Sequence, residues 1–390
     1  MKTWCLRGKC SVLVVTTVCC CVFAQAAHAQ GPRLYVGAST PGMVMRYDGI
    51  TAEPLPGAGQ SCAVFVTDLG NTIGVTIGPD GRLYVVSSGT REVRRYDADT
   101  GTPCPAPGQS GAVYAWGCGL QYVKGLKFGP DGHLYVADSD RNSILQFKGP
   151  YADSPGQYMG VFTSGADGQL YAPGGLAFGP DGCLYVAGNG SGNVVRFEGP
   201  LAQEPGQFVD VVVSVVNAMD LAFGDQRTLY ISSQNTDSVY AFDLLDSSLE
   251  LLPDPDHLLD QPQGLAAGPD CCLYVGSALA HKVARYCGDH LEQFIDCNAC
   301  SPEYPPSFLA FAGLSDCDGN AIPDDCECGD LNGDGEYTQA DFLAFIQAYG
   351  ACATDPPPNR YNIKADMDCD GCITLKDYGL WLECYRNMLP

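Results

Sequence analysis

The stretch GLAFGPDGCLYV, residues 175–186, recurs along the chain and decides the fold. It contains a short apolar segment, a Gly-Pro-Asp-Gly turn and a second short apolar segment. Proline presets φ for a turn, Asp and Gly tolerate the conformations that close it, and the flanking Leu, Phe, Tyr and Val favour strands. Near-copies occupy residues 74–85, 125–136, 220–231 and 264–275. Each copy predicts a β-hairpin, which must stack against others to bury its apolar face.

The spacing of these hairpins predicts the blades of a β-propeller. The LYV-type segments begin at six leucines: Leu34, Leu83, Leu134, Leu184, Leu229 and Leu273. The intervals are 49, 51, 50, 45 and 44 residues, the length of a four-stranded blade. Third strands are expected at 43–48, 92–97, 143–148, 193–198, 238–243 and 282–287. Fourth strands are expected in the first four repeats, at 63–68, 112–117, 158–163 and 208–213.

Each end of the repeat region holds part of a blade. The first copy, at Leu34, lacks the strand that precedes the others, and the last such strand, 307–311, has no LYV segment after it. Pairing 307–311 with 33–37 completes a sixth blade and leaves no open sheet edge, whereas an open β-solenoid would leave both parts unpaired. The sequence therefore predicts a mainly β fold. We expect a closed six-bladed propeller over 30–312, followed by a small α-helical calcium-binding module.

The repeat resembles the NHL repeat on the residues GLAFGPDGCLYVAGNGSGNVVRF, 175–197. Similar units build a wider group of six-bladed propellers that includes gluconolactonase-like and streptogramin-lyase-like proteins. The resemblance covers about 31–312 and implies the architecture. It does not imply one activity, because propellers host many unrelated functions.

Charge and the N-terminus narrow the class of protein. The 390 residues include 21 Lys and Arg against 45 Asp and Glu, a net charge of −24. Nucleic acids and anionic membranes require clustered positive charge, so neither partner is expected. Residues 1–29 have a basic start, an apolar stretch at 11–23 and the cleavage pattern Ala27-His28-Ala29, typical of a secretory signal peptide. That stretch is too short to span a membrane, so we expect a secreted, soluble chain without a transmembrane segment.

Cysteines fit an exported protein. Of 21 Cys, the five within 1–29 include the run Cys19-Cys20-Cys21, which leaves a lipoprotein as the alternative. Sixteen remain, an even number that favours disulfides in an oxidising compartment. The pairs 297/300 and 369/372 have the spacing of a split zinc site, but their separation in sequence favours disulfides there too.

Two acidic loops near the C-terminus have the spacing of calcium loops. Oxygen ligands fall at loop positions 1, 3, 5, 7, 9 and 12, and glycine at position 6 makes the sharp turn. The first set is Asp330, Asn332, Asp334, Glu336 through its carbonyl, Thr338 and Asp341. The second set, offset by 36 residues, is Asp366, Asp368, Asp370, Cys372 through its carbonyl, Thr374 and Asp377. The sequence predicts Ca²⁺ as the cofactor of a module over 329–390.

Each calcium loop is followed by an apolar helical pattern. The matched residues are Phe342, Phe345, Ile346 and Tyr349, then Tyr378, Trp381, Leu382 and Tyr385. Their spacing predicts one apolar face per helix, and the two faces should pack together. A loop plus following helix, repeated, resembles a type I dockerin, which implies docking to an extracellular cohesin-like partner. Loop positions 10 and 11 depart from the usual small hydroxyl residues, as Gln339, Ala340, Leu375 and Lys376. A calcium-stiffened module with another kind of partner is the alternative.

The linker at 313–328 is rich in Cys and Asp. Asp316, Asp318, Asn320 and Asp324 resemble the ligands of a thrombospondin type 3 repeat, which implies a third calcium site. The alternative is an acidic linker held by cysteines.

The propeller residues indicate binding more than catalysis. Propellers usually bind ligands where the segments entering the innermost strands meet the central channel; here these are 71–73, 122–124, 171–174, 217–220, 261–263 and 304–306. The resemblance to gluconolactonase-like enzymes implies a Glu, an Asn and an Asp around one divalent ion, and only Asn217 and Asp220 offer such oxygens. The Tyr, Asn and Gln in these segments favour a carbohydrate or peptide ligand.

The predicted function is a secreted binding or scaffold propeller, attached through its tail to an extracellular partner. The alternative is an enzyme, a lactonase, a lyase or a glycan-active hydrolase, recruited to a polysaccharide-degrading complex.

Overall fold

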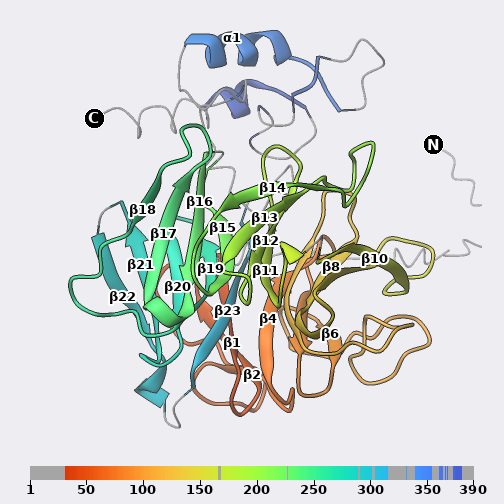
Figure 1. Ribbon diagram of the computed structural model, residues 1–390, viewed down its shortest axis with the longest axis vertical. Helices are drawn as coiled ribbons and strands as arrows, with labels where there is room; N and C mark the ends of the chain where they lie inside the picture. The colour runs from red at the N-terminus through yellow and green to blue at the C-terminus, as the bar shows by residue number, and fades with distance from the viewer. Residues whose placement is uncertain are drawn as a thin grey trace, which may run out of the picture. The chain divides into compact units, whose positions relative to one another are not determined.

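The computed structural model confirms the six-bladed propeller (Figure 1). It describes residues 31–165, 168–225, 227–288, 290–300, 304–314, 331, 339–353, 360–362, 365, 367 and 372–379. Six antiparallel sheets form the blades; five have four strands and one has three. In the first blade the strands are β23 (Pro306–Ala312), β1 (Arg33–Ala38), β2 (Met43–Asp48) and β3 (Val64–Val66).

The remaining blades follow in chain order. The second is β4 (Thr72–Ile77), β5 (Leu83–Ser87) and β6 (Glu92–Tyr96). The third is β7 (Val123–Phe128), β8 (Leu134–Asp138), β9 (Ser143–Phe147) and β10 (Tyr158–Ser164). The fourth is β11 (Pro173–Phe178), β12 (Leu184–Gly188), β13 (Asn193–Phe197) and β14 (Phe208–Val213). The fifth is β15 (Ala218–Phe223), β16 (Thr228–Ser233), β17 (Ser238–Asp243) and β18 (Leu249–Leu251). The sixth is β19 (Pro262–Ala267), β20 (Leu273–Ser277), β21 (Lys282–Cys287) and β22 (His290–Asp296). Short 3₁₀ helices are η1 (Ser139–Arg141), η3 (Gln234–Thr236) and η4 (Cys297–Cys300).

The ring closes as the two partial blades predict. β23 pairs antiparallel with β1, with Phe311 opposite Leu34 and Leu309 opposite Val36. The innermost strands contact one another in the order β23, β4, β7, β11, β15, β19 and back to β23. Every innermost strand is therefore flanked by two others, which confirms closure.

In four of the six blades, a tyrosine, an aspartate and a side chain of the third strand hold the hairpin together. In the fourth blade, Tyr185 donates a hydrogen bond of 3.0 Å to Asp181, and Arg196 lies 3.3 Å from the same carboxylate. The same Tyr-to-Asp bond occurs in the pairs Tyr84–Asp80, Tyr135–Asp131 and Tyr274–Asp270. A Cβ on Gly179 would lie 2.6 Å from the Tyr185 ring, which explains the glycine before the turn. The motif is thus structural.

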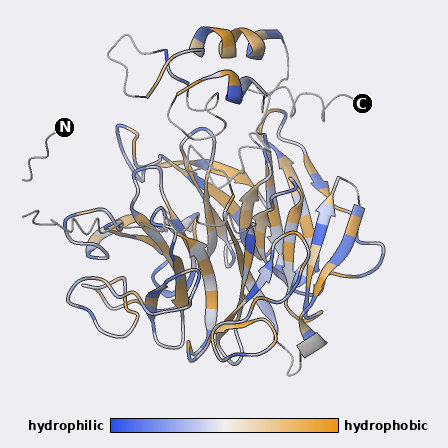
Figure 2. Cartoon of the chain, turned by 180° about the vertical axis from the view of Figure 1, so that it is seen from behind, coloured by the Kyte–Doolittle hydropathy of each residue, from blue (hydrophilic) through white to orange (hydrophobic). Residues whose placement is uncertain are grey.

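Aromatic pairs join neighbouring blades. In four blades, the tyrosine of the LYV segment meets, edge to face, a phenylalanine at or next to the end of the neighbouring innermost strand. These pairs are Tyr84–Phe128, Tyr135–Phe178, Tyr185–Phe223 and Tyr274–Phe311, with ring centroids 4.8–5.3 Å apart. The last pair bridges the sixth blade to the first, so the closing interface uses the same contact as the others. Apolar residues are concentrated along the strands (Figure 2).

The second blade differs from the prediction, because 112–117 is not a strand. Val113 forms only an isolated bridge to Arg94, and Trp116 bridges to Gln157 of the third blade. The Trp116 indole donates a 3.0 Å hydrogen bond to the Pro155 carbonyl, and its amide donates 2.9 Å to Gly156. The start of the segment still lies beside β6, where the Arg95 amide donates to the Ala112 carbonyl and the Tyr114 amide donates to the Val93 carbonyl, both over 2.8 Å. From Trp116 on, the backbone bonds to the next blade instead. The fourth strands at 63–68, 158–163 and 208–213 are confirmed in position.

In the described part of the tail, α1 (Gln339–Ala348) packs over a small core. Its cluster contains Leu331, Phe345, Ala348, Ala365, Met367 and Ile373. The ring of Phe345 lies 5.6 Å from that of Tyr378, which supports packing between the segments that follow the two loops. The predicted apolar face is wrong in part, because Ile346 and Tyr349 are exposed. Ala348 takes the buried place, since α1 turns Phe345 and Ala348 toward the core. Trp381, Leu382 and Tyr385 lie outside the described residues.

Candidate functional site

Side chains gather where the innermost strands of the third, fourth and fifth blades begin. Lys124 lies at the start of β7, is only 8% exposed, and donates a 3.1 Å hydrogen bond to the side-chain oxygen of Asn189. Its ammonium lies 5.9 Å from the centre of the Tyr122 ring. Burial lowers the pKa of Lys124. The structure therefore holds a poorly hydrated cation beside an exposed aromatic ring.

Asn189 connects this cation to the neighbouring blades. Its amide nitrogen donates to the Asn217 carbonyl over 3.3 Å, and the Asn217 amide returns a bond of 3.4 Å to the Asn189 carbonyl. Asn217 adopts a left-handed φ of 51°, which turns its backbone into this exchange at the start of β15. The predicted candidate Asn217 thus positions Asn189.

Tyr171 provides a second aromatic surface nearby. It is 58% exposed, and Tyr122 is 40% exposed. A Cβ on Gly190 would lie 2.3 Å from the Tyr171 ring, so this ring lies directly over the residue after Asn189. We call Tyr122, Lys124, Tyr171 and Asn189 the amino-end site. The sequence singled out the segments that contain Tyr122, Lys124 and Tyr171. It did not indicate Asn189, which lies in the turn between β12 and β13.

Asp220, the other predicted candidate, is buried in the wall of β15. It is 4% exposed, and its carboxylate accepts a 2.9 Å hydrogen bond from the Leu265 amide of β19. Burial raises its pKa to about 7, while the bond from Leu265 and the charge of Lys127 lower it. A Cβ on Gly175 would lie against this carboxylate, so the glycine leaves room for it. Asp220 therefore bonds to the neighbouring strands, whereas the side chain of Asn217 bonds to the turn after β12.

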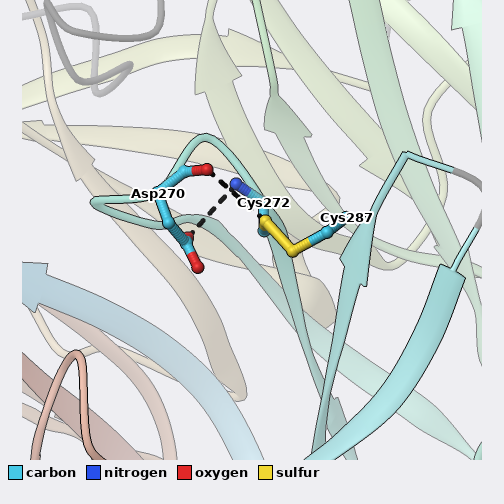
Figure 3. A group of neighbouring side chains, drawn as sticks. All are labelled: Asp270, Cys272 and Cys287. Carbon is cyan, nitrogen blue, oxygen red and sulfur yellow. Dashed lines mark hydrogen bonds between the residues drawn. A yellow bond between two sulfur atoms is a disulfide. The ribbon is translucent and has the colours of Figure 1, made fainter.

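Among the described residues, one group of three metal-ligand types lies close together: Asp270, Cys272 and Cys287. Figure 3 shows that the two sulfur atoms are joined, and Cys272 and Cys287 form a disulfide with Cα atoms 4.7 Å apart. The Cys272 amide donates to the Asp270 carboxylate over 3.3 Å. The group is a stapled turn, since sulfurs in a disulfide are not thiolate ligands.

The split zinc alternative is wrong. Cys372 forms a disulfide with Cys352, so it offers no thiolate. Cys297 is a buried free thiol, and burial raises its pKa to about 12. Cys62 and Cys271 are also disulfide-bonded, while Cys104, Cys118 and Cys183 are free thiols. Disulfides are thus confirmed for Cys62, Cys271, Cys272, Cys287, Cys352 and Cys372. They are not found at Cys104, Cys118, Cys183 and Cys297, which are free thiols.

Four of the predicted calcium ligands fall on described residues. Asp341 and Asp377, the two position-12 carboxylates, are 1% and 0% exposed. Asp377 accepts hydrogen bonds of 2.7 and 3.0 Å from the amide and hydroxyl of Thr374. Cys372 and Thr374 are half-buried beside it. The remaining candidates lie outside the described residues: Asp330, Asn332, Asp334, Glu336, Thr338, Asp366, Asp368, Asp370, Asp316, Asp318, Asn320 and Asp324.

A cavity also occurs at the opposite, carboxyl ends of the innermost strands. It measures about 520 Å³ and is lined by residues of all six of these strands, with Lys127 among them. The sequence analysis did not predict this cavity, because it considered only the segments that enter the innermost strands, at their amino ends. The recurring Ala177, Ala222, Ala266 and Ala310 in the innermost strands are the signal that would have found it.

Comparisons with known proteins agree with this fold. The family model "SMP-30/Gluconolactonase/LRE-like region" matches residues 106–235, which include the amino-end site. No curated protein matches the chain. A solved nidogen–laminin complex is similar at 13% identity and a TM-score of 0.52, covering 72% of this chain and 98% of that one. A Bacteroides caccae protein of unknown function has 13% identity and a TM-score of 0.50, covering 72% and 99%. A virginiamycin B lyase from Staphylococcus aureus, solved with quinupristin, has 13% identity and a TM-score of 0.43, covering 61% and 73%. Identity this low shows the propeller fold alone.

Helices of the described residues are all too short or too polar to cross a membrane.

Proposed function

We propose that the propeller is a binding module that takes an acidic saccharide at the amino-end site, and that a calcium-loaded tail attaches the exported chain to an extracellular protein. The observation that carries the first half is the hydrogen bond from buried Lys124 to half-buried Asn189. Exposed Tyr122 lies beside Lys124, and exposed Tyr171 lies over the residue after Asn189. Sugar rings present apolar faces that stack on aromatic side chains, and their hydroxyls suit amide partners.

The charge of Lys124 favours an acidic sugar over a neutral one. Within the described residues, Lys124 has a single hydrogen-bond partner, the neutral Asn189 oxygen. An ammonium held in such surroundings gains more from a carboxylate than an exposed one does, because water screens the attraction less. The whole chain has a net charge of −24, so attraction for a uronate has to come from a local cation such as Lys124.

Substitution of this site is expected to weaken saccharide binding. Tyr171→Ala should reduce the affinity for an oligogalacturonate about tenfold, because it removes a stacking surface without disturbing the core. Lys124→Met should remove the preference for the acidic sugar over its neutral counterpart. Titration calorimetry of the mature chain measures both effects, with Tyr151→Ala as the control. Tyr151 is exposed but donates to the Pro79 carbonyl, in a turn after the carboxyl end of β4. Unchanged affinity in both site variants would remove the proposal.

Calcium in the tail is supported by two loops of matching ligand spacing, and by the burial of the position-12 carboxylates Asp341 and Asp377. Buried carboxylates are costly unless they are paired, hydrogen-bonded or bound to a metal. A loop-plus-helix pair stiffened by Ca²⁺ would present a fixed surface to a cohesin-like or other extracellular partner, and residues 1–29 would direct export.

Removal of calcium is therefore expected to loosen the tail while the propeller stays folded. The mature chain should bind about two Ca²⁺ ions, and Asp341→Ala should lose one of them. Chelator should lower the melting temperature of a tail transition, because metal binding to the folded state adds to its stability. Calorimetry with Ca²⁺, and with Mg²⁺ as the control ion, tests this. Equal melting with and without chelator, or unchanged stoichiometry in Asp341→Ala, would contradict it.

An enzyme of the lactonase or lyase kind is the second candidate, because the family match spans Lys124, Asn217 and Asp220. Burial lowers the pKa of Lys124, which is the direction that a general base requires. The two functions separate cleanly: turnover of a lactone or glycan that is lost in Asn217→Ala and Asp220→Ala would favour the enzyme, whereas a binding module keeps its affinity in Asp220→Ala.

A further inference from the structure

The carboxyl-end cavity is large enough for a small ligand. Its volume of about 520 Å³ lies in the ordinary range of small-molecule sites. Four blades place alanine at the same inward position, at Ala177, Ala222, Ala266 and Ala310, where Lys127 occupies the third blade. The four alanines thus leave open space at this level of the ring, and Lys127 is the long side chain at the corresponding position.

The side chains that line the cavity are mostly apolar, and one of them is charged. Aromatic side chains from four blades line it, namely Phe128, Phe178, Phe223 and Phe311. Lys127 is the single charged side chain among the described lining residues, and it is half-buried. Asp220, one residue before the lining residue Leu221, is buried, and the charge of Lys127 lowers its pKa.

This cavity is separate from the amino-end site. Ile73, Met219 and Phe308, from three innermost strands, belong to one buried cluster and line no part of the cavity. Lys124 and Lys127 lie three residues apart on β7, which corresponds to about 10 Å along a strand. A ligand could therefore bind in the carboxyl-end cavity without contacting the amino-end site.

We propose that the carboxyl-end cavity binds an apolar molecule that carries one anionic group, with the aromatic and alanine wall covering the body and Lys127 holding the anion. The inference goes beyond the saccharide function, since it concerns another site and another class of ligand. A cation in an apolar pocket selects an anion, because charge-assisted bonds strengthen where water is excluded. Carboxylates and sulfonates share this chemistry.

Two fluorescent probes of similar aromatic body test the proposal on the mature chain. 8-Anilinonaphthalene-1-sulfonate carries the anion and N-phenyl-1-naphthylamine does not. Lys127→Met should weaken the sulfonate about tenfold and leave the neutral probe within about twofold, whereas Lys127→Arg should retain the sulfonate. Ala222→Leu should exclude both probes by filling the cavity. Decanoate should displace the sulfonate from the unchanged chain.

Controls distinguish this site from others. Lys148→Met removes a cation that pairs with Asp153 outside the cavity, and it should change neither probe. Lys124→Met should also leave both probes bound, so failure of the saccharide proposal would be seen separately. Thermal melts confirm that each variant is folded. Equal sulfonate affinity in the folded Lys127→Met variant would overturn the proposal, as would full binding in Ala222→Leu.

Discussion

Gly125→Ala is expected to lower the free energy of unfolding by about 3 kcal/mol, because the hub of the ring has no room for a methyl group. A Cβ on Gly125 would lie 2.7 Å from the Gly174 carbonyl oxygen and 2.8 Å from the Gly175 Cα, both backbone atoms of the next blade. Backbone in a paired strand cannot move aside cheaply, so the whole blade would shift. Urea denaturation of the mature chain measures the loss.

Gly119→Ala is the matched control for that experiment. No atom lies within 4 Å of a Cβ at Gly119, and its φ is not in the left-handed region. We expect its stability to stay within about 0.5 kcal/mol of the unchanged chain. If Gly125→Ala proved as stable as Gly119→Ala, the close approach of β7 and β11 would be wrong.

The unchanged chain is expected to lose stability between about pH 5 and pH 8, and Asp220→Asn is expected to remove much of this pH dependence. The pKa of Asp220 is raised from 3.8 to about 7 in the folded state, so folding takes up a proton between these values. Its contribution to stability is complete below its unfolded pKa and is lost as the pH rises through 7. The full effect is on the order of 4 kcal/mol, and asparagine, which has no proton to lose, should show a flatter profile.

The surroundings of Asp220 support that direction. The Leu265 amide of β19 bonds its carboxylate, Gly175 of β11 contributes only backbone, and Ser232 of β16 binds the Asp220 amide. Lys127 of β7 is the charged group that acts on it, and this attraction is smaller than the effect of burial. Urea denaturation of both proteins across this pH range measures the difference. Parallel profiles for the two would show that Asp220 is already ionised when folded.

The propeller could be predicted from sequence because its hairpins depend on local chemistry. The Gly-Pro-Asp-Gly turn, the Tyr185–Asp181 bond and the pairing of β1 with β23 all follow from repeated residues and from the need to close the sheet edges. Segment 112–117 could not be predicted, because its strand pattern competes with bonds from Trp116 to another blade.

The sites were only partly predictable, because they join residues that are distant in sequence. Lys124 meets Asn189 across 65 positions, and nothing local to the turn at 188–192 signals that contact. The exposure of Ile346 in α1 likewise depends on which neighbour covers the helix, a choice that helical spacing alone leaves open. Periodicity therefore gave the elements, and packing decided their contacts.

Two calorimetric titrations of the mature chain, one with trigalacturonate and one with the neutral galactose trimer, test the amino-end site. We expect one saturable site for the acidic trimer and much weaker binding of the neutral trimer. In Lys124→Met, the difference in affinity between the two trimers should be lost. Equal affinity for the two trimers, or no binding of either, would contradict the assignment of the amino-end site.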